Sequence, residues 1–516
     1  MLAPRRDGGT IGADNKSIKP YSKKFAKMEN RDIVPRLTAF LWVDSKTMNL
    51  HSGARTFSVT SPVDGSIYAT RNYADGAAVE AAVARARAAL PGWRRTPLAE
   101  RLAILLRFGE EMKARATPLA EAVAWQIGRP LWQADETPRL ALIGELLAGA
   151  GPDTLADMPY PSDENIRRYA KPMAGGLHLS ICAWNYPTAM LGYLVTSPLA
   201  AGNVVIFKHS PQTPLIAELA EEAFRAAGGP EGVFQSLHLD HPDAERLIAS
   251  GFFNAVNFIG SVNGGRRVHA AAAGTFTQVH LELGGKDPTY VRSDADLEAA
   301  VPLIAEGTYS NAGQSCCSVE RIYVDRSIHD RFVEALVAET AKWSIGHPIG
   351  EKPMVGPVVR AVAADTIRGL TESAVRAGAK RLMPPDGALK AASLGTAYVA
   401  PEVLTGVDHS MQIMRDELFG PVACVQAVGG DDEAIRLMND SDYGLSASIW
   451  TRDVERGVTL LDEVEAGTVY LNRCDHADLY LPWGGIKNSG LGRTNGRAGL
   501  IEATAAKAYH VRCVIA

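Results

Sequence analysis

Short apolar runs alternate with helix-like segments along residues 176–259, and this alternation limits the folds that the chain can adopt. Buried strands are predicted at 176–182, 203–207, 232–234 and 255–259, and helices near 189–200, 215–227 and 243–250. Strands that alternate with helices predict βαβ units and a parallel sheet, and therefore an α/β fold. Ligands of such sheets bind beyond the carboxyl ends of the strands, so functional residues are expected directly after these runs.

A helical block precedes this region, and a second α/β pattern follows it. Helices are expected near 77–90, 98–113, 118–126 and 139–148, and later near 296–308 and 328–343. A strand is expected at 321–324, and a long Gly- and Pro-containing stretch leads to another at 422–425. Two further strands, at 165–171 and from residue 506, stand apart from both patterns. Isolated strands of this kind are candidates for pairing with another subunit.

Composition narrows the class of protein. The chain has 516 residues, 46% of them hydrophobic and 22% charged, which suits a globular protein with large cores. Its net charge of −5 provides no global basic field, so neither a nucleic acid nor an anionic membrane is an expected partner. The 6 cysteines are scattered and lack metal-ligand spacing, so we expect a reducing compartment, the cytoplasm, and no metal site.

The N-terminal segment, residues 1–50, is predicted to be a basic extension. Its first part is rich in Lys and Arg, carries few acidic residues and lacks the apolar core of a secretory signal. A flexible basic arm is the favoured interpretation, and an organelle-targeting segment is the alternative.

Cys316 and Glu282 are the residues that most directly suggest chemistry. Cys316 lies in the run Asn-Ala-Gly-Gln-Ser-Cys-Cys, and Glu282 lies upstream in Leu-Glu-Leu-Gly-Gly-Lys. A thiol that attacks a carbon centre and a carboxylate that activates water are together sufficient for covalent acyl chemistry. Taken alone, either residue is more typical of ordinary packing or of a solvated surface.

Several motifs in one order carry a resemblance to a known family. They are Ala183–Pro187 (AWNYP), Phe207–Pro214 (FKHSPQTP), Phe258–Ser261 (FIGS) with Gly265, Leu281–Lys286, Gly313–Cys317, Asp416–Val422 (DELFGPV) and Pro482–Gly490 (PWGGIKNSG). From about residue 55 to its C-terminus, the chain resembles the aldehyde dehydrogenase superfamily, in its non-acylating NAD(P)-dependent branch.

The resemblance implies an aldehyde dehydrogenase-like α/β fold with three parts. A Rossmann-like cofactor-binding domain would comprise residues 51–155 and 175–285, and a catalytic α/β domain residues 286–485. A small β oligomerisation element would comprise residues 156–174 and 495–516. The family pairs such strands across subunits, so a homodimer or homotetramer is expected.

The resemblance also implies NAD(P)-dependent oxidation of an aldehyde to a carboxylic acid. Cys316 matches the nucleophile, and Cys317 is interpreted as a packed neighbour. Asn185 matches the side-chain donor to the oxyanion, which the Cys316 backbone N–H would also bind. Glu282 matches the base that activates water for hydrolysis of the thioester. A coenzyme-A-acylating enzyme and a non-catalytic protein on the same fold are the alternatives.

NAD or NADP is the implied cofactor. Gly260, Ser261 and Gly265 would begin a helix beneath the pyrophosphate, where free N–H groups favour anions. Lys208 would reach the adenosine ribose, Glu417 and Phe419 the nicotinamide end, and Trp184 would help to wall the site. The full implied set is Ile181, Trp184, Asn185, Lys208, Gly260, Ser261, Gly265, Glu282, Leu283, Glu417 and Phe419.

Three departures from the family pattern bear on specificity. Ala183 stands where Pro is usual, which should alter the turn slightly and leave Asn185 usable. Pro211 replaces a Glu that many NAD-preferring members carry, so NADP should be tolerated or preferred. Residues 473–480 form an unusually polar loop at the expected aldehyde entrance, with Cys474 a candidate to face the tunnel. This loop suggests a polar or cationic aldehyde, such as an amino-aldehyde; a solvated loop is the alternative.

Overall fold

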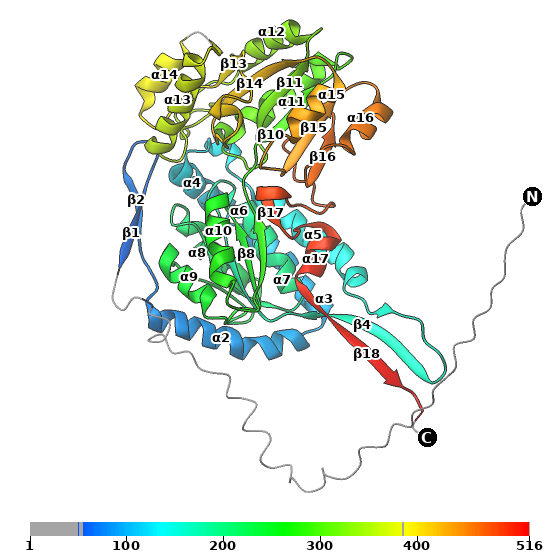
Figure 1. The fold of residues 1–516 in the computed structure, drawn as a ribbon. Helices are drawn as coiled ribbons and strands as arrows, with labels where there is room; N and C mark the ends of the chain where they lie inside the picture. The colour runs from blue at the N-terminus through cyan, green and yellow to red at the C-terminus, as the bar shows by residue number, and fades with distance from the viewer. Residues whose placement is uncertain (1–49, 51–54, 384–385, 515–516) are drawn as a thin grey trace, which may run out of the picture. The chain divides into compact units, whose positions relative to one another are not determined.

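The computed structural model describes residues 50, 55–383 and 386–514 (Figure 1). The predicted basic extension therefore lies outside the described residues, apart from Leu50. The first described elements are a hairpin, β1 (Thr56–Thr60) and β2 (Ile67–Asn72), which the sequence did not predict. Both strands are largely exposed, so neither carries the continuous apolar run of a buried strand.

A six-stranded sheet holds the strands predicted between residues 176 and 259. Its order is β17 (Gly490–Leu491), β9 (Gln278–Glu282), β8 (Ala255–Ile259), β5 (Leu177–Ile181), β6 (Val204–Lys208) and β7 (Phe234–Ser236). All neighbours are parallel except β17 and β9. Every residue of β5 and β6 is buried, including the polar His178 and Ser180 in β5 and Lys208 at the end of β6.

Helices flank this sheet, and all but the last lie at places that the sequence predicted or the resemblance implied. Those of the N-terminal block are α2 (Gly76–Arg95), α3 (Leu98–Lys113), α4 (Ala116–Ile127) and α5 (Thr137–Thr154). Those between and after the strands are α6 (Pro187–Leu191), a π-helical turn (Gly192–Thr196), α7 (Ser197–Ala200), α8 (Pro214–Ala226), α9 (His241–Ala249), α10 (Val262–Ala272) and α17 (Gly496–Glu502). Single 3-10 turns lie at Leu131–Gln133, Gln412–Met414 and Lys487–Ser489.

A seven-stranded sheet forms the second α/β pattern. Its order is β12 (Lys380–Leu382), β13 (Glu402–Thr405), β14 (Val422–Val428), β11 (Val319–Asp325), β10 (Asp287–Val291), β15 (Ser446–Trp450) and β16 (Thr468–Leu471). Its helices are α11 (Leu297–Tyr309), α12 (His329–Thr340), α13 (Ala361–Arg376), α14 (Gly387–Leu394), α15 (Asp431–Asn439) and α16 (Val454–Leu461). The Gly- and Pro-containing stretch before β14 is thus not an extended connection, because it contains α13, β12, α14 and β13.

The two strands that stood apart in the sequence pair with each other. β18 (Thr504–Arg512) runs antiparallel to β4 (Ile166–Ala174), from Thr504 opposite Ala174 to Arg512 opposite Ile166, and β3 (Met158–Pro159) completes a three-stranded sheet. The two long strands lie side by side in Figure 1. Tyr169 and Tyr509 stack across the pair with ring centroids 4.6 Å apart.

Within the described part of the chain, no helix has both the length and the apolar character that a membrane span requires.

Candidate active site

The loop that carries Cys316 has an unusual backbone. Asn311, Ala312 and Gly313 follow one another in the left-handed region, with φ values of 52°, 58° and 73°. A Cβ on Gly313 would lie 2.3 Å from the carbonyl oxygen of Gly420, so only glycine fits there. Non-glycine residues in this region are uncommon, and strain of this kind concentrates at functional sites.

Asn185 is tied to this loop in both directions. Its side-chain Nδ2 donates to the carbonyl oxygen of Gln314 at 3.1 Å, and Asn311 Nδ2 donates to the carbonyl oxygen of Asn185 at 3.0 Å. Both side chains are buried. An amide NH2 group has two donors, so the contact with Gln314 uses only one of the two on Asn185. The structure therefore brings the predicted oxyanion donor next to the loop that carries the predicted nucleophile.

A buried ion pair between Glu136 and Arg129 holds the segment that follows Asn185. One carboxylate oxygen of Glu136 accepts the backbone N–H groups of Thr188 and Ala189, at 2.9 and 2.8 Å, where α6 begins. Its other oxygen accepts from Arg129 at 2.6 Å, and the Arg129 guanidinium lies 4.4 Å from the ring centroid of Tyr186. The sequence analysis missed Glu136 and Arg129, because their contacts reach across more than one element and leave no local pattern.

Glu282 ends β9 and is only 6% exposed. The indole N–H of Trp483 donates to one of its oxygens, whereas the other oxygen is buried without a partner among the described residues. Burial raises the pKa of Glu282 to about 8. A carboxyl group with such a pKa can exchange a proton near neutral pH, which a general base requires.

Cys316 and Glu282 share a neighbour in Trp483. Cys317, Leu445 and Trp483 form a buried cluster, and the partly buried Cys316 packs against it. A hydrogen bond with Cys317 lowers the pKa of Cys316, but removal from water and the charges of Glu282 and Asp475 outweigh it, so the pKa is raised. The thiol is therefore mostly protonated near neutral pH and needs a proton acceptor before it can attack.

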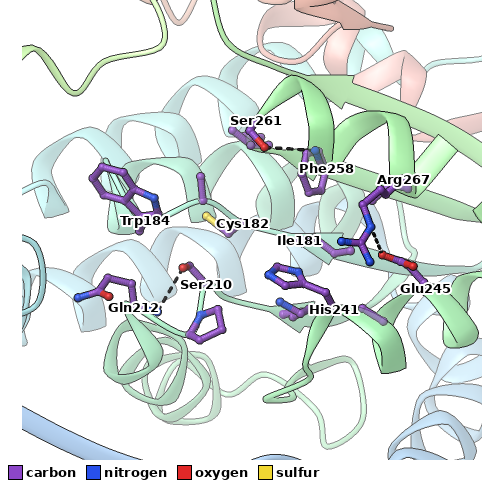
Figure 2. Close-up of a pocket in the computed structure, with 18 of the residues that line it drawn as sticks. Ile181, Cys182, Trp184, Ser210, Gln212, His241, Glu245, Phe258, Ser261 and Arg267 are labelled. Atoms are coloured by element: carbon purple, nitrogen blue, oxygen red, sulfur yellow. Dashed lines mark hydrogen bonds and ion pairs between the residues drawn. The ribbon is translucent and has the colours of Figure 1, made fainter. Parts of the chain in front are cut away.

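Beyond the carboxyl ends of β5, β6 and β8 lies a cavity of about 580 Å³ (Figure 2). Of the residues predicted to contact the cofactor, those that line it are Ile181, Trp184, Lys208, Gly260 and Ser261. Ser261 caps α10, and its side chain accepts the backbone N–H of Gly264 at 3.2 Å. Burial lowers the pKa of Lys208 to about 8. A positive group and a helix N-terminus in one elongated cavity fit a dinucleotide with its pyrophosphate.

Glycines make this cavity possible. A Cβ on Gly260 or Gly264 would lie 2.6 or 2.7 Å from the Phe258 ring. Gly265 and Leu283 lie outside the lining and pack against each other, because a Cβ on Gly265 would lie 2.6 Å from the Leu283 side chain. They thus set the close approach of α10 to the sheet.

Glu417 and Phe419 lie at the Trp184 end of the site. The Phe419 and Trp184 rings meet edge to face with centroids 5.6 Å apart, and Glu417 accepts the backbone N–H of Gly285 at 3.2 Å. Burial, followed by the charge of Glu320, raises the pKa of Glu417 to about 8. The structure therefore places both residues between the dinucleotide cavity and the segment that follows Glu282.

The sequence analysis missed other residues of the cavity wall. They are contributed chiefly by the β1–β2 hairpin, α9 and α10, and include Phe57, Tyr73, His241 and Arg267. The prediction for Cys474 was wrong. Cys474 is buried, and its thiol donates to the carbonyl oxygen of Leu303 on α11 at 3.3 Å, so it points into the core of the seven-stranded sheet.

An α/β fold with a cavity at the carboxyl ends of its strands, lined by a helix N-terminus and by Lys208, fits the class of enzymes that bind a dinucleotide. Comparisons with known proteins agree. The model of the aldehyde dehydrogenase family matches residues 49–509. The chain therefore belongs to the aldehyde dehydrogenase family and is an NAD(P)-dependent aldehyde dehydrogenase.

Curated relatives and solved structures give the same family. A betaine aldehyde dehydrogenase of Mesorhizobium japonicum is 33% identical, over 92% of this chain and 97% of its own. A vanillin dehydrogenase of Pseudomonas fluorescens is 35% identical, over 87% and 93%. The fold is shared by the crystal structure of an aldehyde dehydrogenase from Brucella melitensis biovar abortus, with a TM-score of 0.85 and 30% identity over 89% of this chain and 94% of that one. It is also shared by the crystal structure of the betaine aldehyde dehydrogenase from Staphylococcus aureus with NAD+, with a TM-score of 0.83 and 27% identity over 89% of this chain and 92% of that one.

Proposed function

We propose that Cys316, Asn185 and Glu282 are the catalytic residues of this aldehyde dehydrogenase. The observation that carries the proposal is the pair of amide contacts between Asn185 and the Cys316 loop, beside a buried Glu282 oxygen that has no partner among the described residues. A buried group without a partner is costly, and catalytic sites are where such costs are retained.

In the proposed oxidation, Glu282 accepts the Cys316 thiol proton and passes it to solvent, the thiolate adds to the aldehyde carbon, and the carbonyl oxygen becomes an oxyanion. Asn185 Nδ2 and the Cys316 backbone N–H donate to that oxygen. When bound, the nicotinamide of NAD or NADP accepts the hydride that leaves the former aldehyde carbon. Cys316 then carries a thioester.

In the proposed hydrolysis, Glu282 takes a proton from a water molecule whose oxygen attacks the thioester carbon. The C–S bond breaks, the Cys316 thiolate is released and the carboxylic acid leaves. Transfer of the acyl group to coenzyme A is the alternative, and the buried, protonatable Glu282 favours water. Product analysis with and without coenzyme A distinguishes the two, because an acylating enzyme would form an acyl-coenzyme A.

The test of the nucleophile is Cys316→Ala, with Cys513→Ala as its matched control because Cys513 is exposed near the C-terminus. We expect Cys316→Ala to abolish aldehyde oxidation while NADH still binds, as measured by fluorescence, and Cys513→Ala to retain activity. Turnover by Cys316→Ala above a hundredth of the wild-type rate would exclude the proposal.

The proposed cofactor contacts follow the cavity. The N-terminus of α10, which Ser261 caps, would hold the pyrophosphate, and Lys208 would reach the adenosine ribose. Gly260 and Gly265 would contribute close approach and not donors, because their N–H groups already donate to the carbonyl oxygens of Glu282 and Ser261. Glu417, Phe419 and Trp184 would enclose the nicotinamide end, next to Asn185 and Glu282, and Ile181 and Leu283 would support the walls. Because Pro211 supplies no carboxylate beside Lys208, we propose that NADP is accepted as well as NAD.

Of the polar and cationic aldehydes that the sequence suggests, we propose a polar aldehyde without a permanent positive charge. Two tyrosines near Cys317, the neighbour of the proposed nucleophile, already face cations: Arg129 lies 4.4 Å from the Tyr186 ring centroid, and Arg139 lies 5.8 Å from that of Tyr193. An added ammonium group would therefore find these aromatic faces already occupied by guanidinium groups.

A panel of betaine aldehyde, an amino-aldehyde, vanillin and a semialdehyde, each with NAD and NADP, tests this substrate class. We expect kcat/KM for vanillin or the semialdehyde to exceed that for betaine aldehyde at least about tenfold, equivalent to about 1.4 kcal/mol. Betaine aldehyde as the best substrate of the panel would refute it.

We also propose that the enzyme is cytoplasmic and forms a homodimer or homotetramer through β4 and β18. Its cofactor-binding domain would comprise residues 51–155 and 175–285, and its catalytic domain residues 286–485. Within the described residues, β18 pairs only with β4, so its second edge is open to a strand of another subunit. Light scattering of a chain that ends at residue 503 should report a smaller oligomer than the full chain. An unchanged mass would argue against assembly through β18.

A further inference from the structure

Asp475 contacts the two residues that flank the proposed nucleophile. Its Oδ1 accepts from the Ser315 hydroxyl at 2.9 Å and from the Cys317 thiol at 2.9 Å. Ser315 and Cys317 are both buried, whereas Cys316 between them is partly exposed. One carboxylate oxygen thus holds both neighbours of Cys316 and leaves the nucleophile itself accessible.

The loop that presents Asp475 is fixed at several points. Asn472 exchanges two hydrogen bonds with the backbone of Thr451, each 2.9 Å long, and the Tyr470 hydroxyl donates to the carbonyl oxygen of His476. Arg139 donates to the carbonyl oxygen of Ala477. The backbone is left-handed at Asp475 itself, with φ 44°. An aspartate can adopt this conformation, and the anchored residues on both sides hold it there.

The two connected loops are distant in sequence, because Asp475 follows β16 whereas Cys316 precedes β11. In the seven-stranded sheet, β16 and β11 are not neighbours; β10 and β15 separate them. The Asp475 contacts therefore link the Cys316 loop, which precedes the central strand β11, to the loop that follows the edge strand β16. We propose that Asp475 is a positioning residue that fixes the direction of the Cys316 side chain by holding Ser315 and Cys317.

The inference rests on the proposed role of Cys316 and deepens it. Asp475 contacts the neighbours of the Cys316 thiol and not the thiol itself. Its proposed role is therefore to orient Cys316, whereas proton transfer remains the role of Glu282. A small misplacement of a reacting group has a large effect on rate. We therefore expect Asp475→Ala to lower kcat by roughly 10- to 100-fold, while the aldehyde KM and NADH affinity change less than about threefold.

The test is a cycle of variants that removes the same contacts from either side. Asp475→Asn keeps an oxygen acceptor and should recover most of the kcat that Asp475→Ala loses. The double variant Ser315→Ala/Cys317→Ala should lose about as much as Asp475→Ala, and adding Asp475→Ala to it should cost less than about a further threefold, because the contacts are already absent. A loss of general stability would not produce this pattern of rescue and non-additivity.

Three results would overturn the inference: a kcat for Asp475→Ala within threefold of wild type, failure of Asp475→Asn to recover activity, or losses that multiply in the triple variant. If Asp475→Ala does not fold, the Ser315→Ala/Cys317→Ala variant decides alone, and wild-type kcat in it refutes the inference. Cys316→Ala separates the two levels of the proposal: its activity would refute the nucleophile, whereas an inactive Cys316→Ala with a fully active Asp475→Ala would refute only the positioning role.

Discussion

Two buried carboxylates, Glu320 and Glu282, have contrasting surroundings. Glu320 on β11 accepts from the Lys286 ammonium at 2.6 Å and from the backbone N–H groups of Leu418 and Phe419, each at 2.8 Å. Glu282 at the end of β9 receives the Trp483 indole N–H on one oxygen, and its other oxygen is buried without a partner among the described residues. The first carboxylate is fully compensated, and the second is not.

The difference separates a structural role from a chemical one. Because Glu320 has an ion partner and accepts two backbone N–H groups, it can hold the backbone that follows Glu417. A buried carboxyl group with one donor is easier to protonate, which is why the pKa of Glu282 rises to about 8. Loss of Glu282 should therefore impair reaction, and loss of Glu320 should impair folding.

The largest expected effect is that of Glu282→Gln on turnover. Without the base, hydrolysis of the thioester should slow, and steady-state kcat should fall roughly 10²- to 10⁴-fold. The acylation half-reaction should still release about one NADH per active site, provided that the thiol is supplied as thiolate at high pH. Stopped-flow fluorescence measures both. A steady-state rate within tenfold of wild type would contradict the role of Glu282 in the comparison.

The next effect is that of Glu320→Gln on stability. This change leaves the fully buried Lys286 ammonium without its counter-charge, which typically costs about 3–5 kcal/mol. Thermal unfolding should show a midpoint several degrees lower, and Glu320→Gln/Lys286→Met should regain part of the loss because no charge is then stranded. A Glu320→Gln variant as stable as wild type would remove the distinction between the two carboxylates.

Sequence reasoning succeeded where a strand or helix carries its own signal. β5, β6 and β8 were predicted because burial selects mostly apolar residues in them, whereas the start of α10 at Gly260, Ser261 and Gly265 was implied by the resemblance. β9 was missed because four of its five residues are at least partly exposed. β10 was missed because it begins with a buried polar residue, Asp287, that bonds Ser446 on β15.

The support around the site could not be predicted for a related reason. Cys316, Glu282 and Asn185 lie in motifs that carry a resemblance, but these motifs do not show which residues hold them in place, even for Trp483, which lies in the motif Pro482–Gly490. Glu136 meets α6, Trp483 meets Glu282, and Asp475 meets Ser315 only after the chain has folded. A single sequence carries no local pattern for contacts between such distant residues.

A smaller effect concerns the pH dependence of stability. The unfolded Glu282 carboxyl ionises near its ordinary pKa of 4.5, but the folded one keeps its proton until about pH 8. Native stability attributable to this group is therefore present at low pH and is lost progressively as the pH rises from about 4.5 to 8. Glu282→Gln lacks this loss, so its stability relative to wild type should increase over that range, by about 1–3 kcal/mol. Thermal unfolding at pH 5 and pH 8 measures it, and a difference independent of pH would contradict the burial argument.

The smallest effect extends the comparison to the cofactor cavity, where Lys208 is a cation whose charge is incompletely balanced, since burial lowers its pKa to about 8. Pro211→Glu would place a carboxylate beside it, in the same cavity wall. The added charge should favour protonated Lys208 but repel a 2′-phosphate, so the ratio of kcat/KM for NAD to that for NADP should rise roughly tenfold, equivalent to about 1.4 kcal/mol. Pro211→Gln, which adds a similar volume without charge, is the matched control and should shift the ratio much less. Two results would contradict this explanation. One is a wild-type kcat/KM for NAD more than tenfold above that for NADP, and the other is an equal change of the NAD/NADP ratio in Pro211→Glu and Pro211→Gln.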